Sequence, residues 1–256
     1  MPKFGGKVAV ITGAGSGIGQ AMAWRFMREG ASIVVVDQAT AAADATVRHL
    51  RAEGGETVAC AYIADVSQPS AAQAMVAHAI NRYGRIDILC NNAAILSETS
   101  VVSCEPEEWD RVMAVNVRGV YLGCKYVIPY MLAQGGGCII NTASTAAHVG
   151  LLNRAVYSAS KGAVLALTRQ IAIEYAGNGI RANSISPGSV ESPLLIEMMN
   201  RQANPIAYRA DLAAKHPLQR LATPDEIAGT AVYLASDDAA FVTGTDIVVD
   251  GGLIAR

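Results

Sequence analysis

Short runs of β-branched and other apolar residues alternate along the chain with longer stretches that carry apolar residues at helical spacing. A short unbroken apolar run is typical of a strand that is buried on both faces. The runs predict seven strands, at 8–11, 33–36, 58–63, 86–90, 138–141, 180–185 and 247–249. The stretches between them predict one helix that ends near residue 29 and others at 38–52, 70–83, 107–133, 157–176 and 224–236.

Strands that alternate with helices in this way pair in parallel, because each helix returns the chain to the same edge of the sheet. We therefore expect an α/β fold of the Rossmann-like, doubly wound kind, with a parallel sheet of about seven strands and helices on both faces. Neither a proline- or serine-rich linker nor an internal repeat interrupts the pattern. This continuity favours a single domain over residues 1–256.

The segment from about residue 189 to residue 223 departs from this rhythm. It contains three prolines and an apolar cluster made of Leu194, Leu195, Ile196, Met198 and Met199. A long irregular segment in a compact domain is usually a binding loop or lid, or else it is disordered. Because the apolar cluster would be poorly placed in water, we expect a lid over a substrate site.

Composition restricts the kinds of partner. The chain is 52% hydrophobic and 16% charged, its formal net charge is −2, and its lysines and arginines form no cluster that would attract nucleic acid or an anionic membrane. No apolar stretch reaches the roughly 18 residues of a membrane span, and residues 1–7 lack the apolar core of a signal peptide. We expect a cytoplasmic protein that binds neither nucleic acid nor membrane, with partner subunits covering part of its apolar surface.

The cysteines and histidines give no sign of a metal site. None of the five cysteines forms a C-x-x-C pair, and three histidines lack the spacing of metal ligands: His49, His78 and His216. The sequence therefore predicts reduced, mostly buried thiols and no bound metal.

A glycine-rich turn, TGAGSGIG, spans residues 12–19 directly after the first predicted strand. Glycines let backbone N–H groups approach a pyrophosphate, and the N-terminus of the following helix attracts its negative charge. Glycine-rich turns are common, but the strand before this one and the helix after it match a dinucleotide site. We expect contacts to the cofactor from Gly13, Ser16, Gly17 and Gly19.

The second predicted strand leads into an acidic residue, Asp37, eighteen residues after Gly19. A carboxylate at this place accepts hydrogen bonds from the adenosine ribose and repels a 2′-phosphate. Ser16 and Gln38 bring no cation that would bind such a phosphate. The pattern favours NAD over NADP, although Asp37 is equally suited to cap the next helix.

Asp65 and Val66 follow the third predicted strand and are placed where the adenine edge would lie. Asp65 would serve equally well as an N-cap for the helix predicted from Ser70. Both interpretations stay open at the level of the sequence.

Tyr157 and Lys161 are four residues apart on a predicted helix, so their side chains share one face. A nearby ammonium favours the phenolate and would lower the pKa of the tyrosine from its reference value near about 10. Such a pair can exchange a proton with a substrate at neutral pH. The spacing alone is common in helices that have only a structural role.

Six motifs occur together in one order: the glycine-rich turn, Asn91-Asn92-Ala93-Ala94 after the fourth strand, Asn116, Ser144 thirteen residues before Tyr157, Lys161, and Pro187-Gly188 after the sixth strand. In this set the chain resembles the short-chain dehydrogenase/reductase family over about residues 7–252. The resemblance implies an oxidoreductase that moves a hydride between nicotinamide and a carbon bearing an alcohol or ketone oxygen.

The resemblance also implies the catalytic roles. Tyr157 would be the general acid/base at the substrate oxygen, and Ser144 would hydrogen-bond the same oxygen as negative charge builds on it. Lys161 would bind the nicotinamide ribose and hold down the pKa of Tyr157. Asn116 would hold a water of a proton relay behind Lys161.

Further cofactor contacts follow from the same resemblance. They are Asn91 with its neighbours Asn92 and Ala93, Ile18 and Val190 at the nicotinamide, Pro187, Gly188 and Ser192. The chain departs from the family at Ala94, where glycine is usual, and at Ser192, where threonine is common. The first departure adds a methyl group near the cofactor, while the second retains a hydroxyl. Most relatives assemble as homotetramers, and we expect the same here.

Two residues near Tyr157 are candidates for substrate contacts. Arg154 is suited either to hold an anionic group or to make a surface or subunit contact, and His148 borders the expected pocket with Val149, Leu151 and Leu152. We expect an NAD-dependent dehydrogenase of secondary alcohols, apolar or cyclic in character. The alternatives are a 3-oxoacyl reductase acting on carrier-protein or CoA thioesters, against which Asp37 and Ser16 count, and a non-catalytic dinucleotide-binding sensor.

Overall fold

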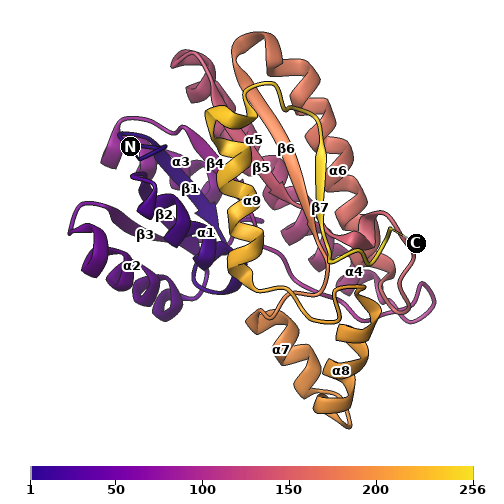
Figure 1. The fold of residues 1–256 in the computed structure, drawn as a ribbon. Helices are drawn as coiled ribbons and strands as arrows, with labels where there is room; N and C mark the ends of the chain where they lie inside the picture. Colours follow the sequence, from indigo (N-terminus) through magenta and orange to yellow (C-terminus); the bar gives the residue numbers. More distant parts are fainter. Residues whose placement is uncertain (1, 256) are drawn as a thin grey trace.

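The computed structural model describes residues 2–255, which form a seven-stranded parallel sheet in the order β3-β2-β1-β4-β5-β6-β7 (Figure 1). The strands are β1 (Val8–Thr12), β2 (Ser32–Asp37), β3 (Ala59–Ile63), β4 (Ile88–Asn91), β5 (Gly137–Thr142), β6 (Ile180–Pro187) and β7 (Asp246–Val249). The predicted doubly wound fold class is confirmed, and the strand bounds differ from the prediction by at most two residues at either end.

The order of the strands reverses beside β1. The chain runs outward from β1 to β2 and β3, then returns to pair β4 against the other side of β1. In an open parallel sheet, ligands bind in the crevice at the carboxyl ends of the strands where this reversal occurs. The fold thus places the glycine-rich turn after β1 and the segment after β4 on the two sides of one crevice.

Helices cover both faces of the sheet. Helices α1 (Gly17–Arg28), α2 (Thr40–Gly54) and α9 (Pro224–Ala235) pack on one face, where Phe26, Leu50 and Ile227 lie in one apolar core with Ile11. Helices α3 (Pro69–Tyr83), α5 (Gly119–Ala133) and α6 (Ala155–Tyr175) pack on the other face around a second core. Parallel strands need cover on both faces because their side chains are apolar on both.

The helix predicted at 107–133 is interrupted. Helix α4 (Pro106–Met113) runs into a π-helical turn, Ala114–Arg118, and α5 follows directly. A π-turn inserts one extra residue into the helical path, and such turns are frequent at functional sites. Here the turn contains Asn116, which the sequence analysis placed in the catalytic set.

The segment predicted as an irregular lid, 189–223, contains two short helices, α7 (Pro193–Asn200) and α8 (Pro205–Lys215). Each begins with a proline after a capping residue, since Ser192 accepts from the N–H of Leu195 and Asn204 from that of Ala207. Their apolar side chains Met198, Met199 and Leu212 form a separate cluster with Leu221, which follows α8. In Figure 1 the two helices project below the carboxyl ends of the strands.

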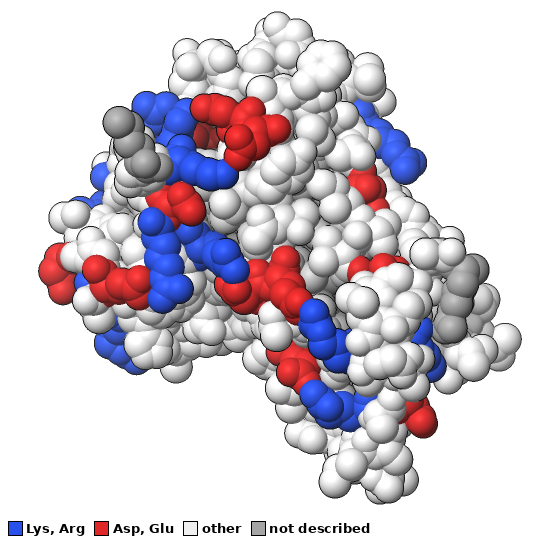
Figure 2. Space-filling view, viewed as in Figure 1, with Lys and Arg blue, Asp and Glu red and all other residues white. Residues whose placement is uncertain are grey.

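The visible surface carries charges of both signs intermixed. Figure 2 shows lysines and arginines lying next to aspartates and glutamates rather than in a patch of one sign. Several of these neighbours are ion pairs, such as Arg25 with Asp225 and Arg220 with Glu226. Within residues 2–255, no helix has both the length and the apolar content that crossing a bilayer requires.

Candidate active site

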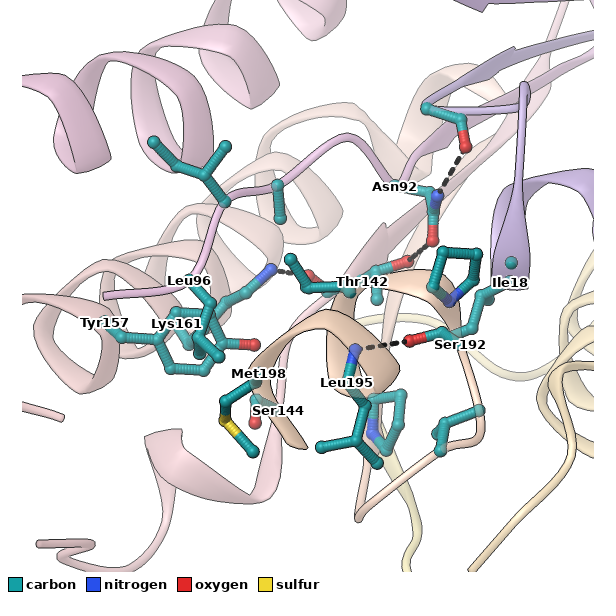
Figure 3. Close-up of a pocket in the computed structure, with 18 of the residues that line it drawn as sticks. Ile18, Asn92, Leu96, Thr142, Ser144, Tyr157, Lys161, Ser192, Leu195 and Met198 are labelled. Carbon is teal, nitrogen blue, oxygen red and sulfur yellow. Dashed lines mark hydrogen bonds between the residues drawn. The ribbon is translucent and has the colours of Figure 1, made fainter. Parts of the chain in front are cut away.

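One cavity of about 570 Å³ opens at the carboxyl ends of the strands. Residues from five of the six predicted motifs line it, and of the predicted catalytic and cofactor residues Gly19, Asn91 and Asn116 are not part of the wall. Those in the wall are Gly13, Ser16, Gly17, Ile18, Asp37, Asp65, Val66, Asn92, Ala93, Ser144, Tyr157, Lys161, Pro187, Gly188, Val190 and Ser192. Figure 3 shows ten wall residues by name, drawn from segments far apart in the sequence.

The glycine-rich turn leaves space for a phosphate-bearing ligand. Gly13 has a φ of +64°, and a Cβ on Gly19 would clash with the carbonyl oxygen of Gly13, so neither position tolerates a side chain. Gly19 therefore acts by letting the turn close rather than by lining the cavity. Ser16 stands before the first turn of α1 without a side-chain bond to it. The arrangement fits the pyrophosphate of a dinucleotide, which would receive backbone N–H groups at the helix N-terminus.

Asp37 joins two parts of the cofactor cleft. One of its carboxylate oxygens accepts from the N–H of Gly15 at 2.9 Å and the other from that of Ala39 at 3.0 Å. Asp37 thus braces the residue before α2 as well as the glycine-rich turn, and it still lines the cavity. The capping and cofactor interpretations are compatible in the structure.

Asp65 forms a tight turn rather than a helix cap. It accepts from the N–H of Ser67 at 2.9 Å, while α3 begins at Pro69 with Gln68 as the preceding residue. Partial burial raises the pKa of Asp65, but hydrogen bonds from Ser67 and Gln68 outweigh this effect and the net shift is downward. The carboxylate therefore stays charged in the cavity wall.

The two asparagines after β4 face different surroundings. The amide of Asn92 donates to the carbonyl oxygens of Thr12 and Gly13 at 3.2 and 3.3 Å and so braces the turn after β1. Asn91 is buried against Asn141 and Cys124 and lies outside the cavity wall, so the expectation that it lines the cofactor is wrong. Side chains of successive strand residues point to opposite faces, which separates the two asparagines.

Tyr157 and Ser144 meet in the cavity wall, Tyr157 in the first turn of α6 and Ser144 two residues after the end of β5 (Figure 3). Burial raises the pKa of Tyr157, while a hydrogen bond with Ser144 and the charge of Arg154 partly oppose this rise. The hydroxyl is therefore a protonated phenol at neutral pH. Ser144 also accepts from the N–H of Ala146, which fixes its rotamer.

Lys161 is only 2% exposed, and its ammonium donates to the carbonyl oxygen of Thr142 at 2.7 Å. The same nitrogen lies 5.7 Å from the ring centre of Tyr157, so the two side chains share one face as predicted. Burial lowers the pKa of Lys161 to about 8. The expectation that this lysine brings the pKa of Tyr157 below its reference value is wrong for the structure, because burial of the phenol has the larger effect.

Asn116 lies behind the cavity wall and is not part of it. Its amide group donates to the carbonyl oxygen of Ile95 at 2.9 Å and to Ser160 at 3.1 Å, and its oxygen accepts from the N–H of Ile95 at 2.8 Å. Both amide hydrogens are therefore engaged by protein partners. The side chain joins the segment after β4 to α6, the helix that carries Tyr157 and Lys161.

The segment after β6 forms another side of the cavity wall. Val190 bridges to Ala222, and Ser192 caps α7. Behind the segment lies the buried His216, whose Nε2 accepts from the N–H of Ser189 at 3.4 Å while Nδ1 faces the carbonyl oxygen of Asp250 at 2.6 Å. The sequence offers His216 only as a possible metal ligand, because its bonds to backbone groups leave no signature in the sequence.

The remaining wall is largely apolar and includes Leu96, Leu151, Leu195, Met198 and Leu212. His148, expected beside these residues, instead bonds to Asp246 at 2.7 Å on the side of β7. Val149, expected in the same wall, is likewise not part of it, whereas Leu152 is.

Comparisons with known proteins agree with this geometry. Residues 13–254 match the family model described as Enoyl-(Acyl carrier protein) reductase. The chain is 41% identical over 255 residues to cyclohexanol dehydrogenase of Acinetobacter sp. (strain SE19), covering 99% of this chain and 97% of the relative. It is 39% identical over 253 residues to 2-(R)-hydroxypropyl-CoM dehydrogenase of Xanthobacter autotrophicus (strain ATCC BAA-1158 / Py2), covering 97% and 99%.

Among solved structures, levodione reductase superposes with a TM-score of 0.96 at 36% identity and covers 99% of both chains. The chain belongs to the short-chain dehydrogenase/reductase family, an oxidoreductase family whose members act on small molecules with NAD or NADP.

Proposed function

We propose that this protein is an NAD-dependent dehydrogenase that interconverts a secondary alcohol and its ketone. The observation that carries the proposal is the meeting of Tyr157, Ser144 and Lys161 in the wall of one cavity that also holds the glycine-rich turn. The nicotinamide of the bound cofactor supplies or accepts the hydride, and the residues of the chain supply position and charge.

In this proposal the chain holds the cofactor along the carboxyl ends of β1, β2 and β4. The turn at Gly13 and Gly17 with Ser16 binds the pyrophosphate, and Asp65 with Val66 borders the adenine. Ala93, Asn92 and the segment from Pro187 to Ser192, with Ile18, line the path to the nicotinamide. Lys161 donates to the nicotinamide ribose from its anchor on Thr142.

The hydroxyl of Tyr157 is the group that transfers the proton. In the direction of reduction the phenol donates its proton to the substrate oxygen, which becomes the hydroxyl of the alcohol. Ser144 donates a hydrogen bond to the same oxygen while negative charge develops on it. In the reverse direction the phenolate takes the proton of the alcohol.

The choice of NAD over NADP rests on Asp37. Its carboxylate lines the cavity between the glycine-rich turn and α2, where the adenosine ribose would lie. The charge disfavours a 2′-phosphate and its oxygens suit the ribose hydroxyls. A 3-oxoacyl reductase, the alternative of the sequence analysis, would be expected to use NADP and is thereby disfavoured.

The α7–α8 segment is proposed as the lid of the substrate side. Its apolar cluster packs with Leu96 across the cavity, which suits an apolar or cyclic substrate. The proposal extends to a homotetramer in the cytoplasm. Exposed apolar side chains on the outer helices and near β7 support subunit contacts: Tyr121, Ile173 and Phe241.

The experiment that tests this function is a turnover assay with a panel of cyclic and linear secondary alcohols and their ketones, with NAD(H) and NADP(H) in parallel. The absorbance of the reduced nicotinamide reports turnover. We expect oxidation and reduction with NAD(H) and at least tenfold lower kcat/KM with NADP(H). Turnover restricted to NADP(H) and to 3-oxoacyl thioesters would instead support the alternative.

A further inference from the structure

Arg154 lies inside the substrate end of the cavity and not on the molecular surface. Its side chain is 13% exposed, it lines the cavity, and it precedes the first turn of α6 three residues before Tyr157. Tyr157 lines the same cavity, and the charge of Arg154 lowers the pKa of its phenol. A substrate that reaches Tyr157 therefore passes close to this cation.

The guanidinium is already paired with a carboxylate. Both of its terminal nitrogens donate to the same oxygen of Glu98, each at 3.2 Å. Glu98 lies in the segment after β4, so the pair joins this segment to the catalytic helix. The positive charge that a substrate would meet is thereby neutralised by a group of the protein.

One donor of Arg154 has only a weak acceptor. Its Nη2 nitrogen, besides the bond to Glu98, points at the thioether sulfur of Met198 on α7 at 3.0 Å. A thioether accepts hydrogen bonds weakly, whereas a carbonyl, ester or hydroxyl oxygen accepts them well. A substrate oxygen that replaced Met198 at this nitrogen would gain a charge-assisted hydrogen bond without breaking the pair with Glu98.

An anionic group of the substrate would bind less favourably at Nη2 of Arg154 than an uncharged oxygen. Arg154 is already paired with Glu98, which lies behind it and outside the cavity wall, so a second carboxylate at Arg154 would be repelled by the first. Besides Arg154 and the Lys161 beside Tyr157, the charged wall residues near α7 and α8 are Glu197 and Lys215, one of each sign. Arg154 thus offers a donor for an uncharged oxygen, while its own charge is paired with Glu98.

We propose that the Arg154–Glu98 pair selects substrates that carry a second, uncharged hydrogen-bond acceptor apart from the reacting carbon, and that Glu98 disfavours carboxylates at that position. This inference rests on the proposed function, because it names the substrate class of the same cavity. It assigns the apolar wall to the body of the substrate and Arg154 to its far oxygen.

The test uses methyl ketones that differ only at the end opposite the reacting carbonyl. Each has two, three or four methylene groups between this carbonyl and a methyl ester, a carboxylate or an ethyl group. The variants are Arg154→Met and Glu98→Gln, with Arg48→Met and Glu107→Gln as controls at exposed positions on α2 and α4. Ratios of kcat/KM within one variant are compared, so that a general loss of activity cancels.

For the wild type at the best spacer length, we expect kcat/KM for the ester to be about tenfold or more above kcat/KM for the ethyl ketone and for the carboxylate. One charge-assisted hydrogen bond is enough for a difference of this size. Arg154→Met removes the preference for the ester over the ethyl ketone. In Glu98→Gln, kcat/KM for the carboxylate should rise at least tenfold relative to kcat/KM for the ester. Both control variants should keep the wild-type ratios.

A wild type that prefers the carboxylate, or an Arg154→Met variant whose ester preference is unchanged, overturns the inference alone. If the wild type reduces none of these ketones or the panel of the proposed function, the proposed function fails and this inference fails with it. Binding of NADH, followed by its fluorescence, is measured in every variant, so that misfolded protein is recognised. If Arg154→Met proves unfolded, the shift expected in Glu98→Gln decides the question.

Discussion

Lys161 is anchored on Thr142: its ammonium donates to the backbone carbonyl oxygen at 2.7 Å. Thr142 is the last residue of β5, in the middle of the sheet, so a rigid strand end sets the position of the amine. From this anchor the nitrogen lies 5.7 Å from the ring centre of Tyr157. The distance between the amine and the phenol is therefore fixed by backbone geometry and not by a counter-charge.

The buried ammonium of Lys161 should make stability depend on pH. Folding lowers its pKa from 10.5 to about 8, so the charged form costs free energy in the fold at every pH below 8, and the cost disappears as the pH rises from 8 to 10.5. A shift of this size corresponds to about 3 kcal/mol. The free energy of unfolding of the wild type, relative to that of Lys161→Met, should rise by up to this amount over that interval.

Urea unfolding at pH 7, 8, 9 and 10 measures this difference. Lys125→Met, at an exposed lysine of α5, is the control and should show no such trend. A difference between wild type and Lys161→Met that stays constant, or that falls as the pH rises, would contradict a buried charged lysine.

The pH dependence of the reaction should follow Tyr157. Because burial raises its pKa, the phenol is protonated at neutral pH, so kcat/KM for ketone reduction should be level there and should fall only in alkaline solution. Alcohol oxidation needs the phenolate, and its kcat/KM should rise through the alkaline range. Arg154→Met removes a charge that lowers this pKa, so both limbs should move to higher pH. Profiles that coincide for wild type and Arg154→Met would argue against Tyr157 as the titrating group.

Asp37 should determine the ratio between the two cofactors. Asp37→Asn keeps an oxygen that can accept from Gly15 and removes the charge that repels a 2′-phosphate. We expect the preference for NAD over NADP, measured as the ratio of kcat/KM, to fall about tenfold or more. Asp44→Asn, an exposed position on α2, is the matched control. An unchanged ratio in Asp37→Asn would remove the basis for assigning NAD.

Asn116 should act as a positioning residue. Asn116→Ala breaks its bonds to Ile95 and Ser160, which we expect to cost about 2 kcal/mol or more of stability and to lower kcat at least tenfold with KM for NADH little changed. Asn183→Ala removes a similarly buried asparagine, bonded to Val242 and Thr245 away from the cavity. It should cost similar stability and leave kcat unchanged well below the unfolding temperature. Equal losses of kcat in Asn116→Ala and Asn183→Ala would indicate that Asn116 has only a structural role.

The sequence predicted the sheet and the residues of the site because both depend on local signals. Apolar runs such as 8–11 and 180–185 mark strands buried on both faces, and the glycine-rich turn and the Tyr157–Lys161 spacing are short motifs. The sequence does not predict the π-turn at Ala114–Arg118. Its residue Asn116 bonds to Ile95, twenty-one residues away, and contacts over such a distance leave no local pattern in the sequence. The anchor of Lys161 was missed because a backbone carbonyl acceptor has no residue signature.

Two other errors had signals that were not used. The segment 189–223 is expected from the sequence to be irregular, although Ser192-Pro193 and Asn204-Pro205 are the cap and first-turn pairs that begin helices. Asn91 was grouped with Asn92, although the alternation of side chains along β4 and its extension separates them. By contrast, the net effect of burial on the pKa of Tyr157 required the packed structure.

The most direct test of the account is single-turnover hydride transfer in Tyr157→Phe, which removes one hydroxyl and keeps the ring. The wild type, Tyr157→Phe and a control, Tyr175→Phe at the far end of α6, are mixed with NADH and a ketone that the wild type reduces, and the loss of NADH absorbance is followed. We predict that Tyr157→Phe binds NADH within about threefold of the wild type and transfers hydride about 10²–10⁴-fold more slowly, while Tyr175→Phe is unchanged. Hydride transfer in Tyr157→Phe at more than a tenth of the wild-type rate would contradict the assignment of Tyr157 as the acid/base.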